Sequence, residues 1–109
     1  MNVKIVLSAE AHAFVLKQSM EARAKIDANI RRIENGIISK DLFKKIKGTD
    51  IWELRTLYGG LAYRIMAFWD KQQHSLVIAT HGFVKKTQKT PEKEIAKAIS
   101  IMKEYYDKK

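Results

Sequence analysis

The chain has 109 residues, of which 21 are basic and 12 acidic, giving a formal net charge of +9. This length suits one folded domain, which we expect to span residues 1–109. The absence of cysteine excludes a disulfide framework and a cysteine metal site. No apolar run approaches the roughly 20 residues of a membrane helix. We therefore expect a cytoplasmic protein with no membrane partner.

The first third of the chain is predicted to form a strand followed by two helices. Apolar side chains alternate with others over residues 3–7, which indicates a short strand with one buried face. Ser8 can cap a helix that runs to about Gln18, and a second helix is expected from about Met20 to Asn35. The second helix carries an apolar stripe, at Ala22, Ile26, Ile30 and Ile33. This spacing is typical of a helix that packs one face on a core.

Residues 37–48 show little hydrophobic period, and we expect an irregular connection here. The segment is crowded with lysines, at positions Lys40, Lys44, Lys45 and Lys47. These lysines either flank a nucleic-acid groove or keep an exposed loop soluble.

A β-hairpin is predicted next. Two β-type runs, residues 51–58 and 61–70, flank Gly59–Gly60, which is a two-residue hairpin signal. Counting outward from this loop places Arg55 directly opposite Arg64. Like charges in this arrangement destabilise a hairpin, so we expect the two guanidinium groups to bind phosphate together. Alternatively, both side chains lie over apolar neighbours with their charged ends in water.

A last strand over residues 75–84 is rich in apolar side chains and leads into a basic loop and a final helix. Thr90 is expected to cap this helix and Pro91 to begin it. The loop carries three lysines, Lys85, Lys86 and Lys89. Hydrogen-bond donors that lie together at the open edge of a sheet can bind an anion. Alternatively, the three lysines are ordinary solvated charges.

The charge excess is concentrated in the middle of the chain. Residues 40–90 hold ten basic and four acidic side chains, which is +6 of the total of +9. A basic field of this kind attracts nucleic acid, an acidic protein or an anionic membrane.

The order of elements in a small, basic, cysteine-free chain resembles the RelE/ParE superfamily of bacterial toxins, and within it the HigB-like, often phage-associated branch. The resemblance is carried by Lys47-Gly48, by Trp52-Glu53-Leu54-Arg55, by Tyr63-Arg64-Ile65, and by the run from His81 to Pro91 followed by Glu94 and Ala98. It implies an α+β fold with a twisted, mainly antiparallel sheet of about four strands, an N-terminal helical hairpin and a C-terminal helix.

The resemblance also implies the toxin of a type II toxin-antitoxin system. Such a toxin would be an endoribonuclease that cuts messenger RNA on the ribosome. Its expected partners are therefore mRNA, the ribosome and a cognate antitoxin with a helix-turn-helix DNA-binding domain.

Cleavage of RNA without a metal or other cofactor uses the 2′-hydroxyl as the nucleophile, and it needs a base and cations near the phosphate. Arginine stays protonated, so Arg55 and Arg64 are assigned to the charge of the transition state. A lysine crowded by other cations can have a lowered pKa, which makes Lys85 or Lys86 the candidate base. RNA-binding roles are assigned to Lys45, Lys47, His81 and Lys89. His81 is also a rival proton carrier, or simply a packed histidine.

Two other functions remain open on the sequence. One is a ParE-like toxin that acts on DNA gyrase by protein contact, and the other is an RNA-binding module without catalysis. The arginine pair favours the nuclease, because gyrase poisoning needs no phosphate site on the sheet.

Overall fold

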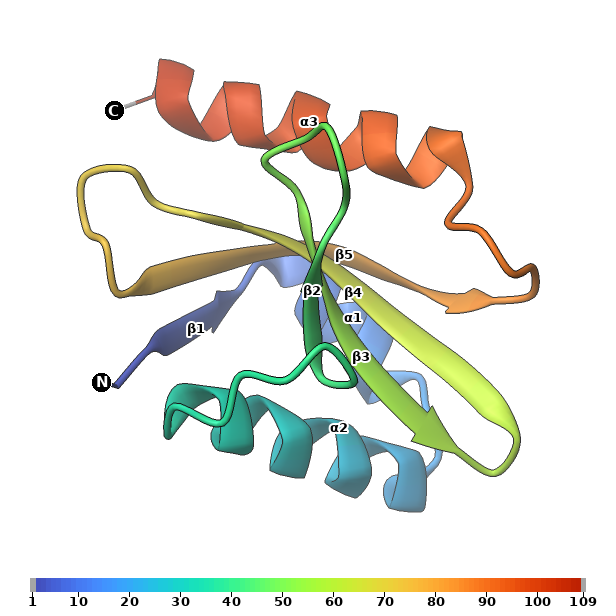
Figure 1. The fold of residues 1–109 in the computed structure, drawn as a ribbon. Coiled ribbons are helices and arrows are strands. Elements are labelled where there is room, and N and C mark those ends of the chain that lie inside the picture. Colours follow the sequence, from blue (N-terminus) through green and yellow to red (C-terminus); the bar gives the residue numbers. More distant parts are fainter. Residues whose placement is uncertain (1, 109) are drawn as a thin grey trace.

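A computed structural model describes residues 2–108 and has the predicted α+β class. Its elements are, in chain order, β1 (Lys4–Leu7), α1 (Ala9–Leu16), α2 (Met20–Glu34), β2 (Phe43–Lys45), β3 (Trp52–Tyr58), β4 (Leu61–Trp69), β5 (Leu76–Lys85) and α3 (Glu92–Asp107). The five strands form one sheet in the order β1-β5-β4-β3-β2, in which only β1 and β5 are parallel. Figure 1 shows the twist of this sheet, with α3 on one side and α2 on the other.

The β3–β4 hairpin has the predicted register. Gly59 and Gly60 have φ angles of 58° and 78°, a left-handed conformation that glycine adopts without steric cost. Pairing then runs outward from Tyr58 and Leu61, and Arg55 lies opposite Arg64. A two-residue loop therefore fixes which side chains share a face of the sheet.

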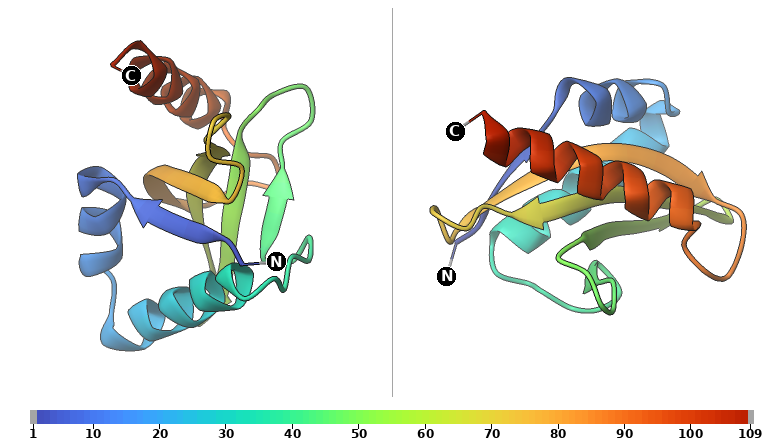
Figure 2. Two further views of the ribbon diagram at one scale, coloured as in Figure 1. Left: turned by 90° about the vertical axis from the view of Figure 1, so that its left-hand side faces the viewer. Right: turned by 90° about the horizontal axis from the view of Figure 1, so that it is seen from above.

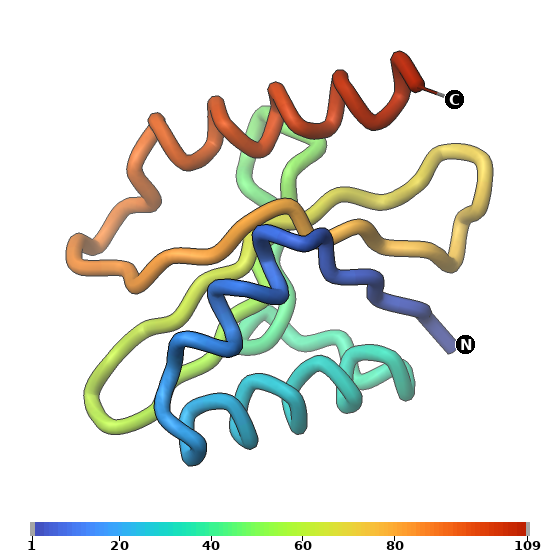
Figure 3. The backbone as a smooth tube through the Cα atoms, turned by 180° about the vertical axis from the view of Figure 1, so that it is seen from behind, coloured from blue at the N-terminus to red at the C-terminus, as the bar shows by residue number. Residues whose placement is uncertain are grey.

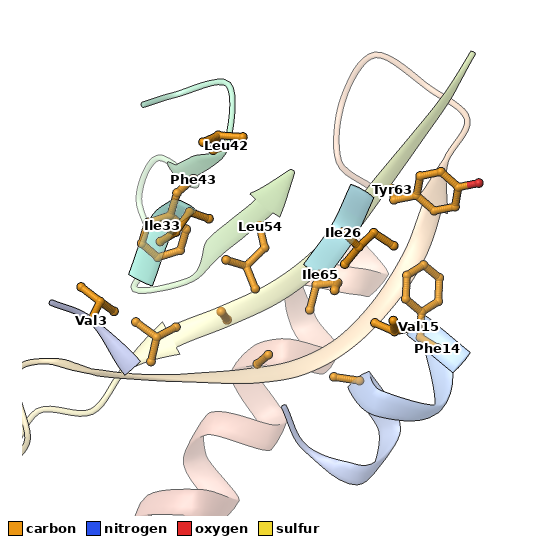
Figure 4. Packing of buried hydrophobic residues seen from close by; sticks show 14 of the residues in the cluster. Val3, Phe14, Val15, Ile26, Ile33, Leu42, Phe43, Leu54, Tyr63 and Ile65 are labelled. Carbon is orange, nitrogen blue, oxygen red and sulfur yellow. The ribbon is translucent and has the colours of Figure 1, made fainter. Parts of the chain in front are cut away.

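The helices cover both faces of the sheet, and a hydrophobic cluster lies under each layer. On one face, Ala22, Ile26 and Ile33 of the predicted stripe are buried, and α1 and α2 pack against β5 and β3. Figure 4 shows Ile26 and Ile33 with Phe14 and Ile65 in this cluster, and Figure 3 shows the turn that joins the two helices. On the other face, α3 packs on β4 and β5 over a second cluster (Figure 2).

Two predictions about the chain trace are corrected by the structure. The segment expected to be irregular contains β2, so the sheet has five strands and not about four. Phe43 explains this short strand, because its ring is buried and stacks on Trp52 at a centroid distance of 4.6 Å. Lys44 and Lys45 are exposed, which hid the strand in the sequence.

The starts and ends of the helices also differ from expectation. The first helix ends at Leu16 and not near Gln18, and the last begins at Glu92 with Pro91 as its N-cap residue. Thr90 does not cap it, because the Thr90 hydroxyl donates its hydrogen bond to Glu53. Within residues 2–108, none of the helices combines the length and the apolar composition needed to cross a bilayer.

Candidate nucleic-acid interface

The arginine pair lies on the face of the sheet that α3 partly covers. Met66 of β4 belongs to the cluster under α3, and the alternation of side chains along β4 places Arg64 on the same face. Arg64 is only 5% exposed, whereas Arg55 is partly exposed. Burial, and next the charge of Arg55, lower the pKa of Arg64, while Glu53 raises it. The structure thus holds two guanidinium groups side by side at a cost in electrostatic energy.

The two guanidinium groups are incompletely hydrogen-bonded. Arg55 Nη1 donates to the carbonyl of Lys40 at 2.9 Å, and Arg64 Nη1 donates to the carbonyl of Tyr63 at 3.2 Å. The Nε atoms of both arginines are buried without a hydrogen-bond partner, the nearest carboxylate oxygen to Arg55 Nε being Glu53 Oε1 at 3.9 Å. A buried charged donor without a partner is costly, and an anion bound beside the pair would supply the missing acceptors.

Glu53 connects the hairpin to the basic loop. Its side chain is buried, with the residue 4% exposed, and it accepts the hydrogen bond from Thr90 Oγ1. Because Thr90 directly precedes Pro91, the N-cap residue of α3, this bond ties β3 to the end of the loop that follows β5. Sequence reasoning assigned Thr90 to helix capping and therefore missed this role.

An open groove of about 440 Å³ lies beside Arg55. Strands β2 and β3 form one wall, and the loop after β5 forms the other. Its lining residues are Lys44, Lys45, Ile46, Lys47, Glu53, Arg55, Lys85, Gln88, Lys89, Thr90 and Ile95. Four of the predicted lysines, Lys45, Lys47, Lys85 and Lys89, are thus brought together with Arg55. We call this hollow the basic groove.

Arg64 lines a second hollow, to which Arg55 also contributes. This hollow measures about 320 Å³ and is lined by Asp41, Arg55, Leu57 and Arg64. Arg55 lines both hollows, whereas Arg64 lines only this one. A much smaller hollow, about 10 Å³, lies within the cluster under α2 and has no cationic wall except Arg55.

The candidate bases Lys85 and Lys86 have different environments. Lys85 is the last residue of β5 and is half-buried in the basic groove, whereas Lys86 is exposed and does not line it. Burial is the largest cause that lowers the pKa of Lys85; Glu53 opposes it, and the charges of Arg64, Arg55 and Lys44 lower the pKa further. Burial, and only after it the crowding of cations expected from the sequence, lowers the pKa of Lys85.

His81 is placed away from the basic groove. It is 2% exposed, its Nε2 lies 3.0 Å from Glu94 Oε1 of α3, and its Nδ1 lies 3.0 Å from Thr80 Oγ1. Burial lowers the pKa of His81, and the hydrogen bond to Glu94 opposes this. In this position His81 joins α3 to the sheet, as the packed-histidine interpretation expects. No group of three or more potential metal-ligating side chains occurs within residues 2–108.

Lys44 and Asp41 were not assigned to the site from the sequence. Lys44 enters it because β2 pairs with β3 and places Lys44 opposite Glu53. Asp41 enters it because the turn before β2 folds against Arg55. Recognising β2 would have been enough to find Lys44, whereas no sequence pattern identifies Asp41.

Comparisons with known proteins bear on the family and the fold. Residues 13–103 match the family model described as phage derived protein Gp49-like (DUF891). The fold is similar to that of a mutant of the E. coli toxin RelE in the free state, with 13% sequence identity, a TM-score of 0.65 and coverage of 92% of this chain and 97% of that one. It is also similar to a chain of the intact E. coli RelBE toxin-antitoxin complex, with 13% identity, a TM-score of 0.57 and coverage of 82% and 100%. No curated protein matches in sequence. These similarities confirm the RelE-like fold.

Proposed function

This chain belongs to the phage-derived Gp49-like protein family, and from that premise we propose that it is the toxin of a toxin-antitoxin system that cleaves messenger RNA. Two observations support the toxin role: the family match, and the RelE-like fold shared with one chain of a toxin-antitoxin complex. The HigB-like branch fits the phage-derived family. A cognate antitoxin, with a helix-turn-helix DNA-binding domain, would hold the protein inactive in the cytoplasm.

The observation that carries the nuclease assignment is the arginine pair. Arg55 and Arg64 face each other across the hairpin, and each has a buried Nε without a hydrogen-bond partner. A phosphate group of RNA would supply the missing acceptors and offset the repulsion between the two guanidinium groups. In the transition state, the same donors would stabilise the additional charge on the phosphorus oxygens.

The groove also supplies a base. Lys85 lines it, and its lowered pKa increases the share of neutral amine that can accept a proton. In the proposed reaction the neutral amine of Lys85 takes the proton of the 2′-hydroxyl. The 2′-oxygen then bonds to phosphorus while the bond to the 5′-oxygen breaks, and the departing oxygen takes a proton from solvent. This step needs no metal ion.

The remaining lysines of the groove would bind the RNA backbone on either side of the reacting phosphate. Lys45 and Lys47 stand on the wall that contains β2, and Lys89 stands on the opposite wall. Their charges provide affinity that does not depend on sequence. The exposed Lys86 would extend the same field toward ribosomal RNA.

The test is to induce the protein in bacteria and map the 5′ ends of cellular messages. Cuts that are phased with codons, and that vanish when translation is blocked, are expected for a ribosome-dependent nuclease. Intact messages with stalled replication would contradict the nuclease and indicate a gyrase poison. Intact messages with protein bound to RNA would indicate a binding module without catalysis.

A further inference from the structure

The hollow next to Arg64 has a different lining from the basic groove. Its four lining residues are one carboxylate, one leucine and the two arginines. Its volume of about 320 Å³ is near the lower end of the range for small-molecule sites, roughly 300 to 1,000 Å³. Phosphate binding alone explains neither the carboxylate, which repels an anion, nor the leucine.

The position of Asp41 is fixed by Arg55 from both sides. Arg55 Nη1 donates to the carbonyl of Lys40 at 2.9 Å, and the backbone N–H of Arg55 donates to the carbonyl of Leu42 at 2.8 Å. Asp41 lies between these two anchored residues. Within residues 2–108, its carboxylate has neither a hydrogen bond nor an ion pair within 4.0 Å, so both oxygens are available as acceptors.

Leu57 provides an apolar surface beside these polar groups. It is 71% exposed, second only to Met20 among the large hydrophobic side chains of residues 2–108, and it lies two residues from Arg55 on the same face of β3. A single exposed leucine is common on protein surfaces. Here it lines a hollow that also contains a carboxylate and two guanidinium groups, which suits a flat ring with polar edges.

We propose that this hollow, the base pocket, binds a guanine base of the RNA; the inference rests on the proposed function. Guanine carries two neighbouring donors, N1–H and the 2-amino group, which fit the two oxygens of one carboxylate. Its O6 and N7 are acceptors for a guanidinium group. Adenine lacks the N1–H donor, and uracil and cytosine place a carbonyl or ring-nitrogen acceptor beside their donor. Asp41 and Arg64 together therefore select guanine, while Leu57 packs on the base.

The base pocket also explains the position of the arginine pair. Arg55 borders both hollows, so a phosphate bound there has its neighbouring base within reach of Asp41. The base would then fix which phosphate of the chain is held in the basic groove. Specificity for one base and the choice of the cleaved bond would follow from the same contact.

The test measures binding of short fluorescent RNAs that carry 2′-O-methyl groups and cannot be cleaved. The purified full chain is titrated with an oligouridine and with the same RNA containing one guanosine, one inosine or one adenosine. The guanosine RNA is expected to bind about tenfold more tightly than oligouridine, as a bidentate contact provides. Inosine, which lacks the 2-amino group, should fall between them.

Asp41→Asn removes the carboxylate at nearly constant size and should reduce the guanosine preference to less than about twofold. Asp27→Asn is the matched control, because it makes the same charge change on α2, which covers the opposite face of the sheet. It should keep the full preference. Circular dichroism checks that both variants are folded.

Different results overturn the inference and the proposed function. Equal binding of guanosine and uridine RNAs with high, salt-sensitive affinity would overturn the base pocket and leave the RNA site standing. The same holds for a preference that persists in Asp41→Asn, or for a preference for adenosine. Failure to bind any RNA, on or off the ribosome, would overturn the proposed function and the base pocket with it.

Discussion

At the scale of single residues, His81 shows that a strand pattern does not determine which side chain a buried residue contacts. The sequence indicates an inner strand position, but only the docking of α3 brings Glu94 to within 3.0 Å of the His81 ring. That contact joins residues that are 13 apart in the sequence and belong to different elements. From the sequence, a histidine close to three lysines was consistent with RNA binding. In the fold, His81 instead packs between the sheet and α3.

Burial of His81 makes the stability of the fold depend on pH. Because its pKa is lowered in the folded state, protons bind the unfolded chain more strongly. The free energy of unfolding should therefore be largest above the unfolded pKa of about 6.5 and should fall as the pH drops below it. Urea midpoints at about pH 7.5 and about pH 5.5 test this, with His81→Gln expected to lose most of the difference. An equal difference in the variant would show that other groups cause it.

Gly82 is required where β5 passes under α1. A Cβ atom built on Gly82 would overlap the ring of Phe14. The overlapping atoms include Cγ, through which the ring is attached, so a small rotation of the ring cannot remove the clash. Gly82→Ala should lower the free energy of unfolding by about 1 to 3 kcal/mol, the usual cost of overpacking. Adding Phe14→Leu, which makes room, should recover part of the loss. Unchanged urea unfolding of Gly82→Ala would contradict this packing.

At the scale of elements, the β3–β4 hairpin could be predicted in detail because its loop is local. Gly59 and Gly60 determine the turn, and counting then sets every pair, including Arg55 with Arg64. β2 could not be predicted, since three residues are too few for a period and its pairing with β3 is set by the burial of Phe43. The basic groove depends on β2 for one wall, so the sequence could name Lys45 and Lys47 as RNA-binding residues but could not place them on that wall.

The bond between Thr90 and Glu53 should stabilise the loop after β5. Thr90→Val keeps the shape of the side chain but leaves a buried carboxylate without this donor, which should cost about 2 kcal/mol in unfolding free energy. Thr87→Val is the matched control, because Thr87 is exposed and bonds only to the carbonyl of Lys89. Urea unfolding of both variants checks this prediction, and equal losses would contradict it.

At the scale of the whole molecule, the two helical layers leave one part of the sheet uncovered. α1 and α2 cover one face, while α3 packs on β4 and β5 of the other and leaves the basic groove open beside β2 and β3. The charge excess of residues 40–90 is concentrated around this opening. The sequence shows where the charge excess lies along the chain. That these charges surround one groove becomes visible only when the order of the strands is known.

The central claim is that the arginine pair holds the phosphate of a cleaved RNA, and growth after induction of Arg64→Ala tests it most directly. Loss of one guanidinium from the transition state should reduce cleavage by about 10²- to 10³-fold, so cells should keep growing. Wild type and the control Arg31→Ala, which removes an exposed arginine of α2, should both arrest growth. Growth arrest by folded Arg64→Ala at the wild-type protein level would contradict the account.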